Sequence, residues 1–142
     1  MRKCVVCGET KPLEDFGYHA RCTDQRKPQC KSCIAEQSRK YRLENPLTVQ
    51  NTRLYSKYKI TLETYNKMLE EQGGVCAICG EVNPNGKALA VDHDHKCCPD
   101  KCKSCGECVR QLLCDRCNTL LGRVNDDVSL LNKAIEYLER MK

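Results

Sequence analysis

Tryptophan is absent from the sequence, and phenylalanine occurs only once among its 142 residues. Because these side chains bury more apolar area than most others, their scarcity argues against a large hydrophobic core. Long apolar runs are also missing, and the first residues, MRKCVVCGE, contain no apolar segment like that of a secretory signal peptide. We therefore expect a small cytoplasmic protein without a membrane segment, stabilised by something other than a large core.

Cysteine, by contrast, is abundant, with 14 residues in the chain. Four C-x2-C pairs stand out: Cys4/Cys7, Cys30/Cys33, Cys76/Cys79 and Cys114/Cys117. In a reducing compartment, pairs at this spacing favour thiolate ligation of zinc over disulfide bonds. Structural zinc therefore takes the place of the missing core in our interpretation.

The first two pairs bracket a module at residues 1–33. Its predicted zinc ligands are Cys4, Cys7, Cys30 and Cys33. A structural zinc contributes on the order of 10–16 kcal/mol of folding free energy in a small peptide, which would supply most of the stability of this module. Cys22 has no predicted ligand role, and we interpret His19 as an ordinary surface histidine, since four thiolates already fill a tetrahedral site.

Residues 34–59 form a predicted basic helical bridge. Helical spacing of apolar residues predicts helices over 34–44 and 47–58, separated at Asn45-Pro46. The basic residues from 39 to 59 accompany a single acid, Glu44, and are candidates for binding a nucleic acid: Arg39, Lys40, Arg42, Arg53, Lys57 and Lys59. A merely solvated helical face is the alternative. The tyrosines could stack on bases, but their helical spacing favours packing into a core: Tyr41, Tyr55 and Tyr58.

Residues 60–142 form a second region with its own zinc site. Its predicted elements follow in order: a helix from the N-cap Thr61 to Gly73-Gly74, strands over 89–95 and 109–113, a short helix over 115–121, and an amphipathic packing helix from about Val128. The predicted zinc ligands, which would clamp the base of the strand–strand–helix unit, are Cys76, Cys79, Cys114 and Cys117.

The first of these strands runs into the sequence Asp92-His93-Asp94-His95. Hydrolysis of a phosphodiester requires a water that loses its proton and charge stabilisation at the phosphate. Asp92 and Asn118 offer the oxygen ligands that Mg²⁺ prefers, and a neutral His93 suits a general base. His95 could bind the scissile phosphate or the water shell of the metal. The alternative is a further zinc ligand set or a solvated turn, and the flanking C-x2-C pairs argue against it.

Several segments resemble the phage recombination endonuclease VII family of HNH nucleases, which have the ββα-metal (His-Me finger) fold. The similar segments are YKITLETYNKMLEEQGGVC, CAIC, VDHDH, LLCDRCN and the tail DD-x-x-LL-x-x-A-x-x-YL, within residues 58–140. The resemblance implies a zinc-stapled homodimer that cuts branched DNA such as Holliday junctions in the cytoplasm of a phage host. It also implies that Asp92 and Asn118 bind Mg²⁺, replaceable by Mn²⁺, that His93 is the general base, and that His95 is the second active-site histidine.

The chain departs from this family in two places. The family has a glutamate near the metal, three residues after the asparagine, where this chain has Leu121. An insert over 96–108, at the tip of the predicted hairpin, is rich in cysteine and predicts a third zinc site. Its expected ligands are Cys98, Cys102, Cys105 and Cys108, with Cys97 as an alternative, and a disulfide or a shared ligand stays open.

We therefore predict a small, zinc-stabilised α+β protein with an N-terminal zinc module (1–33), a basic helical bridge (34–59) and a zinc-clamped ββα-metal nuclease region (60–142). The predicted function is a Mg²⁺-dependent DNA endonuclease with two or three structural zinc ions, which resolves or nicks branched DNA as a homodimer. A homing- or packaging-type HNH nuclease would use the same residues. A non-catalytic, zinc-dependent nucleic-acid-binding protein is the alternative from another class.

Overall fold

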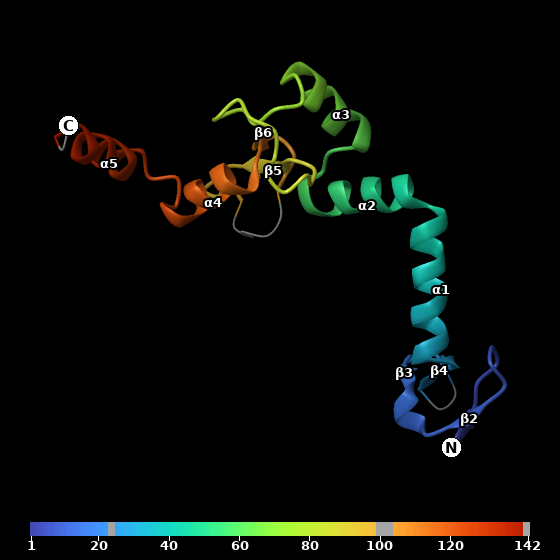
Figure 1. Ribbon diagram of the computed structural model, residues 1–142. Helices are drawn as coiled ribbons and strands as arrows, with labels where there is room; N and C mark the ends of the chain where they lie inside the picture. The colour runs from blue at the N-terminus through green and yellow to red at the C-terminus, as the bar shows by residue number, and fades with distance from the viewer. Residues whose placement is uncertain (23–24, 99–103, 141–142) are drawn as a thin grey trace. The chain divides into compact units, whose positions relative to one another are not determined.

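The computed structural model describes residues 1–22, 25–98 and 104–140 (Figure 1). The chain forms two compact units, Met1–Val49 and Gln50–Lys142, and each is described by itself. No helix in these described ranges is long and apolar enough to cross a membrane. The boundary between the two units falls inside the predicted basic bridge, and the division into three segments stays a prediction.

Short strand pairs and one long helix make up the first unit. Its elements are β1 (Arg2–Lys3), β2 (Thr10–Lys11), the 3-10 helix η1 (Leu13–Asp15), β3 (Phe16–Tyr18), β4 (Arg26–Cys30) and α1 (Lys31–Glu44). β1 pairs with β2 and β3 pairs with β4, both antiparallel. The buried core consists of Phe16, Cys4 and Cys30. A core with one large side chain is too small to fold alone, so this unit depends on what its cysteines bind.

α1 ends at Glu44, Asn45 is its C-cap, and α2 (Pro46–Tyr58) follows directly. Asn45 leaves the helical region (φ −128°, ψ 53°) because it precedes a proline, whereas Pro46 suits the first position of a helix. No side chain of α1 is buried, and Tyr41 and Tyr55 are 52% and 56% exposed. The prediction that these two tyrosines pack into a core is wrong, because periodicity shows only that residues share a face. Tyr58 is half-buried, as predicted.

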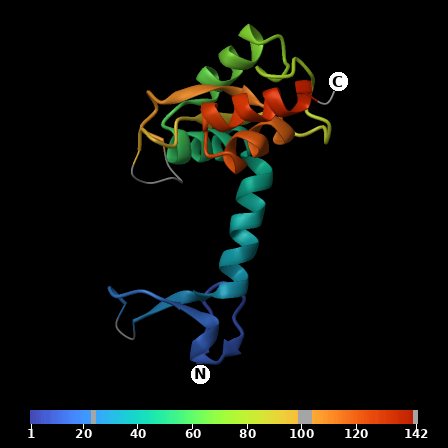
Figure 2. The same ribbon diagram turned by 90° about the vertical axis from the view of Figure 1, so that its left-hand side faces the viewer.

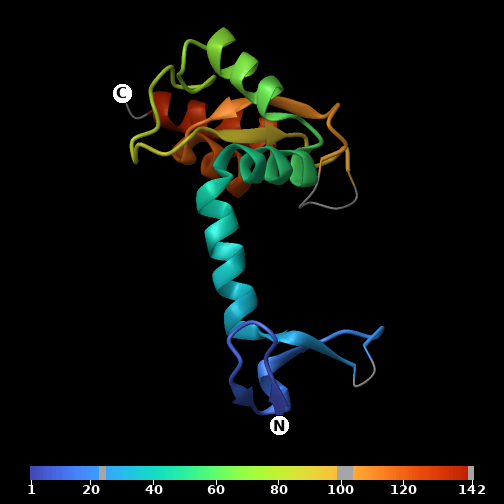
Figure 3. The ribbon, with the colours of Figure 1, turned by 90° about the vertical axis from the view of Figure 1, so that its right-hand side faces the viewer.

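The second unit is built around a two-stranded hairpin. Its further elements are α3 (Leu62–Glu71), β5 (Ala90–His93), β6 (Val109–Leu113), α4 (Asp115–Arg123) and α5 (Val128–Arg140). The antiparallel β5–β6 hairpin lies between α3 on one side and α4 with the C-terminal part of α2 on the other (Figure 1, Figure 2 and Figure 3). The apolar core comprises Leu54, Ile60, Tyr65, Leu89, Val91, Leu112 and Leu113. This order of strand, strand and helix confirms the predicted small α+β fold.

Side-chain hydrogen bonds fix α3 at both ends. At its start, Thr61 Oγ1 accepts a bond from the Thr64 backbone N–H at 3.1 Å, which confirms the predicted N-cap. Beyond its end, Gln72 Nε2 donates to the carbonyl oxygens of Val75 (2.9 Å) and Leu112 (3.0 Å). Gln72 Oε1 accepts a bond from the Leu112 backbone N–H at 2.9 Å. One side chain therefore satisfies three backbone groups and holds the end of α3 against β6.

A bulge interrupts the hairpin next to the acidic and imidazole residues. Val91 pairs with Leu112 and His93 pairs with Val109, so two residues of β6 oppose the single residue Asp92. Asp92 and His93 are both buried, although they are neighbours on one strand. Strand alternation places them on opposite faces, and both faces of this hairpin are covered by helices. One of these two side chains can therefore face a cavity, while the other makes its contacts on the opposite face of the hairpin.

α5 has an amphipathic sequence, but none of its described side chains is buried. Ile135 and Leu138 are 53% and 64% exposed. The predicted helix is confirmed, whereas its predicted packing within the chain is wrong for the residues that the structure describes. The reason is the same as for α1, since an apolar stripe marks a face that needs a partner without saying which element supplies it.

Candidate functional site

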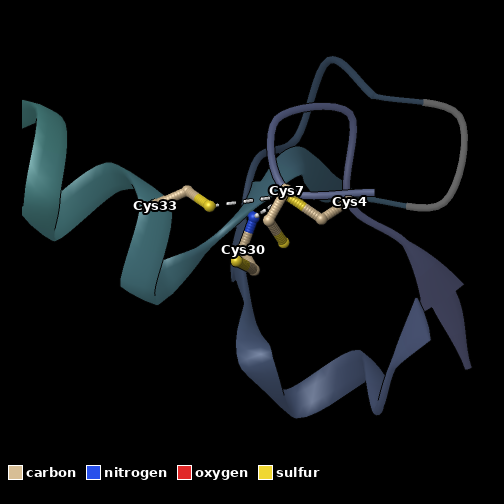
Figure 4. Close-up of side chains that lie close together, drawn as sticks. All are labelled: Cys4, Cys7, Cys30 and Cys33. Carbon is tan, nitrogen blue, oxygen red and sulfur yellow. Dashed lines mark hydrogen bonds between the residues drawn. The ribbon is translucent and has the colours of Figure 1, made fainter. Parts of the chain in front are cut away.

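The first cysteine cluster joins an N-terminal turn to the junction between β4 and α1. Its sulfur atoms, from Cys4, Cys7, Cys30 and Cys33, all lie within 4.8 Å of one another (Figure 4). Cys4 Sγ lies 3.9 Å from Cys33 Sγ and accepts backbone hydrogen bonds from Val6 (3.4 Å) and Cys30 (3.3 Å). These N–H groups favour the thiolate form of Cys4, which is the form that binds a metal.

A second cluster repeats this local geometry at the junction between β6 and α4. The sulfur atoms that lie within 4.8 Å of one another here belong to Cys76, Cys79, Cys114 and Cys117. In both clusters the third cysteine is the N-cap of the helix that follows. In both, a glycine with positive φ follows the first C-x2-C pair, at 74° for Gly8 and 69° for Gly80. Glycine adopts this conformation without steric cost, so the chain can turn tightly around the sulfur atoms.

A third cluster forms at the tip of the hairpin. Its sulfur atoms lie within 4.8 Å of one another and belong to Cys97, Cys98, Cys105 and Cys108. Of the ligands expected here, Cys102 lies outside the described residues. Cys97, the alternative ligand in the sequence interpretation, occupies the fourth place in this cluster.

Sulfur–sulfur separations distinguish metal ligation from disulfide bonding. A disulfide bond is about 2.05 Å long, whereas sulfur atoms about 2.3 Å from one zinc ion at tetrahedral angles lie about 3.8 Å apart. The measured separations across the three clusters are 3.9, 3.8, 3.9 and 3.7 Å. The donor sets therefore fit a soft divalent cation such as zinc.

The thiol pKa values of the first cluster also indicate that it binds a cation. The backbone N–H of Cys30 lowers the pKa of the Cys4 thiol to about 6. The hydrogen bond with the Cys30 sulfur, by contrast, raises the pKa of Cys33 to about 12. Four thiolates cannot coexist here at neutral pH without a cation, because each added negative charge raises the pKa of the next thiol.

β5 delivers His93 to a buried position beside two other rings. The imidazole meets the Tyr58 ring edge-on, with centroids 5.6 Å apart, and the His95 ring in the same way at 4.7 Å. Burial, and after it the electrostatic influence of the neighbouring His95, lowers the pKa of His93 below its ordinary value. Among the described residues, His93 Nε2 is buried without a hydrogen-bond partner. A neutral, unpaired ring nitrogen can accept a proton from water.

His93 opens onto a cavity of about 470 Å³. The cavity is also lined by His95 and Asn118, and by two cationic side chains, Lys57 and Arg123. Three of the four predicted catalytic residues thus share one space, and positive charge beside an imidazole suits an anionic phosphate. Asp92, the fourth, is not among the residues that line this cavity.

Arg110 binds the Asp92 carboxylate through two hydrogen bonds. The Arg110 Nε donates to Asp92 Oδ2 at 2.6 Å, and Nη2 donates to Oδ1 at 3.1 Å. The same Nη2 donates to Asp126 Oδ2 at 3.1 Å, and this oxygen lies 3.8 Å from His95 Nδ1. The other oxygen of Asp126, Oδ1, is buried and has no hydrogen-bond partner among the described residues. One guanidinium therefore joins two acids next to the candidate site.

Sequence reasoning missed both Arg110 and Asp126. Arg110 lies on the return strand opposite Asp92, and opposite charges across a hairpin are a recognisable signal. Because of the bulge, counting residues along the two strands does not predict that Arg110 faces Asp92. Asp126 adopts a positive φ of 56° in the turn after α4, and no sequence pattern indicates that this turn returns to the hairpin.

Three predicted nucleic-acid-binding residues belong to the second unit. Arg53 and Lys57 line a further cavity, of about 430 Å³, which Asn118 also lines. The Lys59 Nζ lies 5.2 Å from the centre of the Tyr55 ring. Arg53 and Lys57 therefore lie beside the candidate site, whereas Lys59 packs over an aromatic ring.

The other three belong to α1 in the first unit. Arg39 forms an ion pair with Glu36 at 2.9 Å, and Lys40 forms one with Glu44 at 3.7 Å. Arg42 Nε donates to the backbone carbonyl of residue 38 at 3.1 Å. Arg39 and Lys40 are therefore partly neutralised within their own helix, which weakens their attraction for a polyanion.

Residues 51–140 match the family described as Recombination endonuclease VII. The chain belongs to this family. It is 32% identical over 142 residues to the Gene 59 protein of Mycobacterium phage D29, an alignment that covers 87% of this chain and 81% of the relative. The Gene 59 protein of Mycobacterium phage L5 is 33% identical over 140 residues, covering 86% and 80%.

Among solved structures, the chain is similar to the crystal structure of the ββα-Me type II restriction endonuclease Hpy99I. The two share 24% sequence identity with a TM-score of 0.38. The likeness covers 99% of this chain but only 65% of that chain.

Membership in the recombination endonuclease VII family confirms the resemblance found in the sequence and places the chain among nucleases. Leu121, which stands where the family has a glutamate, is partly buried against the apolar core. This position of α4 therefore supplies packing instead of a carboxylate. The carboxylate of Asp126 lies beside Arg110 and His95.

Proposed function

We propose that this member of the endonuclease VII family is a Mg²⁺-dependent HNH endonuclease that hydrolyses phosphodiester bonds in DNA. The observation that carries the proposal is His93, whose imidazole has a buried, unpaired ring nitrogen and which lines a cavity together with Asn118 and two cationic side chains. Such a reaction needs a base for the attacking water and positive charge near the phosphate. Both are available around one cavity.

His93 serves as the general base in this proposal. Its lowered pKa keeps the ring neutral at pH 7, so that Nε2 can take a proton from the attacking water. The edge contacts with Tyr58 and His95 limit rotation of the ring. Lys57 and Arg123 attract the phosphate into the cavity, and His95 contacts the phosphate or its waters.

Asn118, which lines the cavity, and Asp92, which lies outside its lining, are the residues that would hold Mg²⁺. A carboxylate and an amide oxygen match the hard-oxygen preference of this cation. Each Asp92 oxygen accepts one bond from Arg110 and keeps a further lone pair for a metal. Bound Mg²⁺, or Mn²⁺ in its place, supplies charge stabilisation at the phosphate. Arg110 orients Asp92, as partners behind a metal-binding carboxylate commonly do.

The first two cysteine clusters hold structural zinc in this proposal. All eight cysteines lie at junctions between strands, turns and helices and line no part of the candidate catalytic cavity. Zinc bound by four thiolates has no open ligand position, so it stabilises a fold without activating water. Zinc and Mg²⁺ therefore have separate tasks in the same chain.

The proposed substrate is branched DNA such as a Holliday junction, cut by a homodimer. Resolving a four-way junction requires two cuts, and each chain has one candidate site, so two chains must act together. The exposed apolar face of α5, which includes Ile135 and Leu138, supports a pairing role. Sedimentation at assay concentrations tests this assembly, and a monomer there contradicts it.

One observation favours a non-catalytic role as a zinc-dependent nucleic-acid-binding protein. Arg110 engages both oxygens of Asp92, so this carboxylate is already neutralised by a cation of the chain itself. A homing- or packaging-type HNH nuclease would differ from the leading proposal in its substrate alone.

Cleavage of supercoiled plasmid with and without Mg²⁺ tests the proposal, followed by linear, nicked and four-way substrates. We expect nicking that requires Mg²⁺ or Mn²⁺ and is fastest on the four-way substrate. Binding without cleavage in either metal would support the non-catalytic role. Equal cleavage of every substrate would keep the nuclease and remove the junction preference.

A further inference from the structure

We propose that Cys97, Cys98, Cys105 and Cys108 bind a third zinc ion, and that this zinc module fastens the tip of the β5–β6 hairpin to the C-terminal end of α2. The metal site stands independently of the proposed function. Its effect on DNA binding and cleavage rests on that function, because the end of α2 carries Lys57 and Tyr58 next to His93.

The ligand atoms are arranged as in the other two clusters. The Cys97 and Cys105 sulfur atoms are 3.9 Å apart, and those of Cys98 and Cys108 are 3.7 Å apart. The Cys105 backbone N–H donates to Cys98 Sγ at 3.3 Å, which matches the N–H to sulfur bonds around Cys4. These separations are those of thiolates around one tetrahedral zinc ion and exceed a disulfide bond by far.

The hairpin itself holds three of the four ligands in place. Beyond β5, the Asp94 backbone N–H donates to the Cys108 carbonyl at 2.9 Å, which continues the strand pairing toward the tip. Asp94 Oδ1 accepts a bond from the Lys96 backbone N–H at 2.8 Å and shapes the turn that leads into Cys97 and Cys98. The site is therefore an extension of the strands that carry Asp92 and His93.

The segment around the fourth ligand, Cys105, contacts the end of α2. The Ser104 backbone N–H donates to the Lys57 carbonyl at 2.9 Å, and Ser104 is buried. Carbonyl groups in the last turn of a helix lack partners within the helix, so this bond caps α2. Gly106 has a φ of 99°, and a Cβ there would lie 3.1 Å from Lys59 Cβ. The two backbones are therefore in close contact.

This docking connects the zinc module to the candidate active site. The Tyr58 ring meets the His93 ring, and Lys57 Nζ lies 5.0 Å from the centre of the Tyr58 ring. Lys57 also lines both cavities beside Asn118. None of the four cysteines belongs to the described apolar core, which contains its own cysteine cluster. Loss of the third zinc should therefore free Lys57 and Tyr58 while the core of the second unit stays folded.

Zinc content of single variants tests the metal site. We expect three zinc ions per chain in the wild type and in the matched control Cys22→Ser, whose sulfur lies beside His19 and outside the three clusters. Cys97→Ser and Cys105→Ser should each contain two, with far-ultraviolet circular dichroism unchanged. Cys102→Ser should retain three. Two zinc ions in the wild type would overturn the site, and loss of zinc from Cys102→Ser with retention in Cys97→Ser would overturn the ligand set.

Two glycine variants separate docking from metal binding. Gly106→Ala places a methyl group against Lys59, whereas Gly86→Ala adds one at a similar positive φ of 68° into open space. We expect both to keep three zinc ions. Gly106→Ala and Cys97→Ser should each lower the slope of log DNA affinity against log salt by about 0.9, the contribution of one phosphate contact, through loss of Lys57.

Unchanged slopes in both Gly106→Ala and Cys97→Ser, equal to that of Gly86→Ala, would show that the zinc module does not position α2. A wild type that holds three zinc ions and binds DNA but never cleaves it would instead overturn the proposed function and leave the third zinc site standing. The two failures are therefore distinguishable by zinc content and cleavage measured on the same samples.

Discussion

His93 is a histidine whose burial favours the neutral ring. Burial holds its pKa in the folded protein below the ordinary value of 6.5, so the ring reaches half-protonation only below that pH. A general base must be neutral, and we therefore expect kcat/KM for cleavage to fall in acid with a midpoint below pH 6.5. Zinc content measured in the same samples controls for acid release of zinc from its thiolates. An acidic midpoint above pH 6.5 would contradict this role for His93.

Arg110 neutralises two acids, Asp92 and Asp126, whose side chains are 8% and 10% exposed. Breaking a fully buried ion pair costs about 3–5 kcal/mol, and since Arg110 is 39% exposed, solvent screening reduces the expected loss in Arg110→Ala to about 1–3 kcal/mol. Mg²⁺ should stabilise this variant more than the wild type, because it then neutralises the Asp92 carboxylate in place of the missing guanidinium. Thermal unfolding with and without Mg²⁺ measures both effects.

Arg140→Ala is the matched control for Arg110→Ala, because Arg140 pairs with Glu136 at the surface, where both side chains are well exposed. It should leave the unfolding temperature close to that of the wild type. Equal Mg²⁺ stabilisation of the wild type and Arg110→Ala would argue against Asp92 as a metal ligand.

At this scale, the sequence predicted that His93, His95 and Asn118 lie together, as their shared cavity shows, but not the contacts that support them. The residues around Asp92 and His93 predict a metal-assisted hydrolase only together with the flanking C-x2-C pairs and Asn118, and the role of each residue stays a prediction. Arg110 could not be placed, because a bulge changes which residue of β6 faces Asp92. Asp126 could not be placed either, because its turn comes back to the hairpin through the fold rather than through a local pattern.

Among the structural elements, the two junctions between a strand and a helix depend on cysteine. Apparent binding free energies of structural zinc, about 10–16 kcal/mol, are as large as the whole stability of a typical small domain, about 5–15 kcal/mol. We therefore expect Cys76→Ser to unfold the second unit, because Cys76 is fully buried in its core. Cys22→Ser should leave the unfolding temperature unchanged. A folded Cys76→Ser protein with full zinc content would remove this cluster from its proposed structural role.

Helix and strand positions were predictable where local signals are strong. Thr61 caps α3, Asn45-Pro46 separates α1 from α2, and the return strand over 109–113 is found where expected. The packing of α1 and α5 was not predictable, because periodic apolar residues identify a face without identifying what covers it. Both helices keep large apolar side chains exposed in the described chain.

For the whole molecule, the basic residues divide into two sets that should differ in their effect on DNA binding. Replacing Arg53, Lys57 and Lys59 together by alanine should reduce the salt slope of DNA affinity by up to about 2.7, since each phosphate contact contributes about 0.9. Replacing Arg39, Lys40 and Arg42 should reduce it less, because two of these already pair with acids. Zinc content should not change in either variant. An unchanged slope in the first variant would show that DNA is held elsewhere.

The central claim is that His93 acts as the base of a Mg²⁺-dependent nuclease, and one ratio tests it most directly. This is the single-turnover rate of plasmid nicking by His93→Ala relative to His19→Ala, a matched change at a histidine of the first unit. We expect His93→Ala to be about 10²–10⁴-fold slower, the scale of general-base assistance, at equal DNA affinity and zinc content. Equal rates for the two variants would contradict the claim.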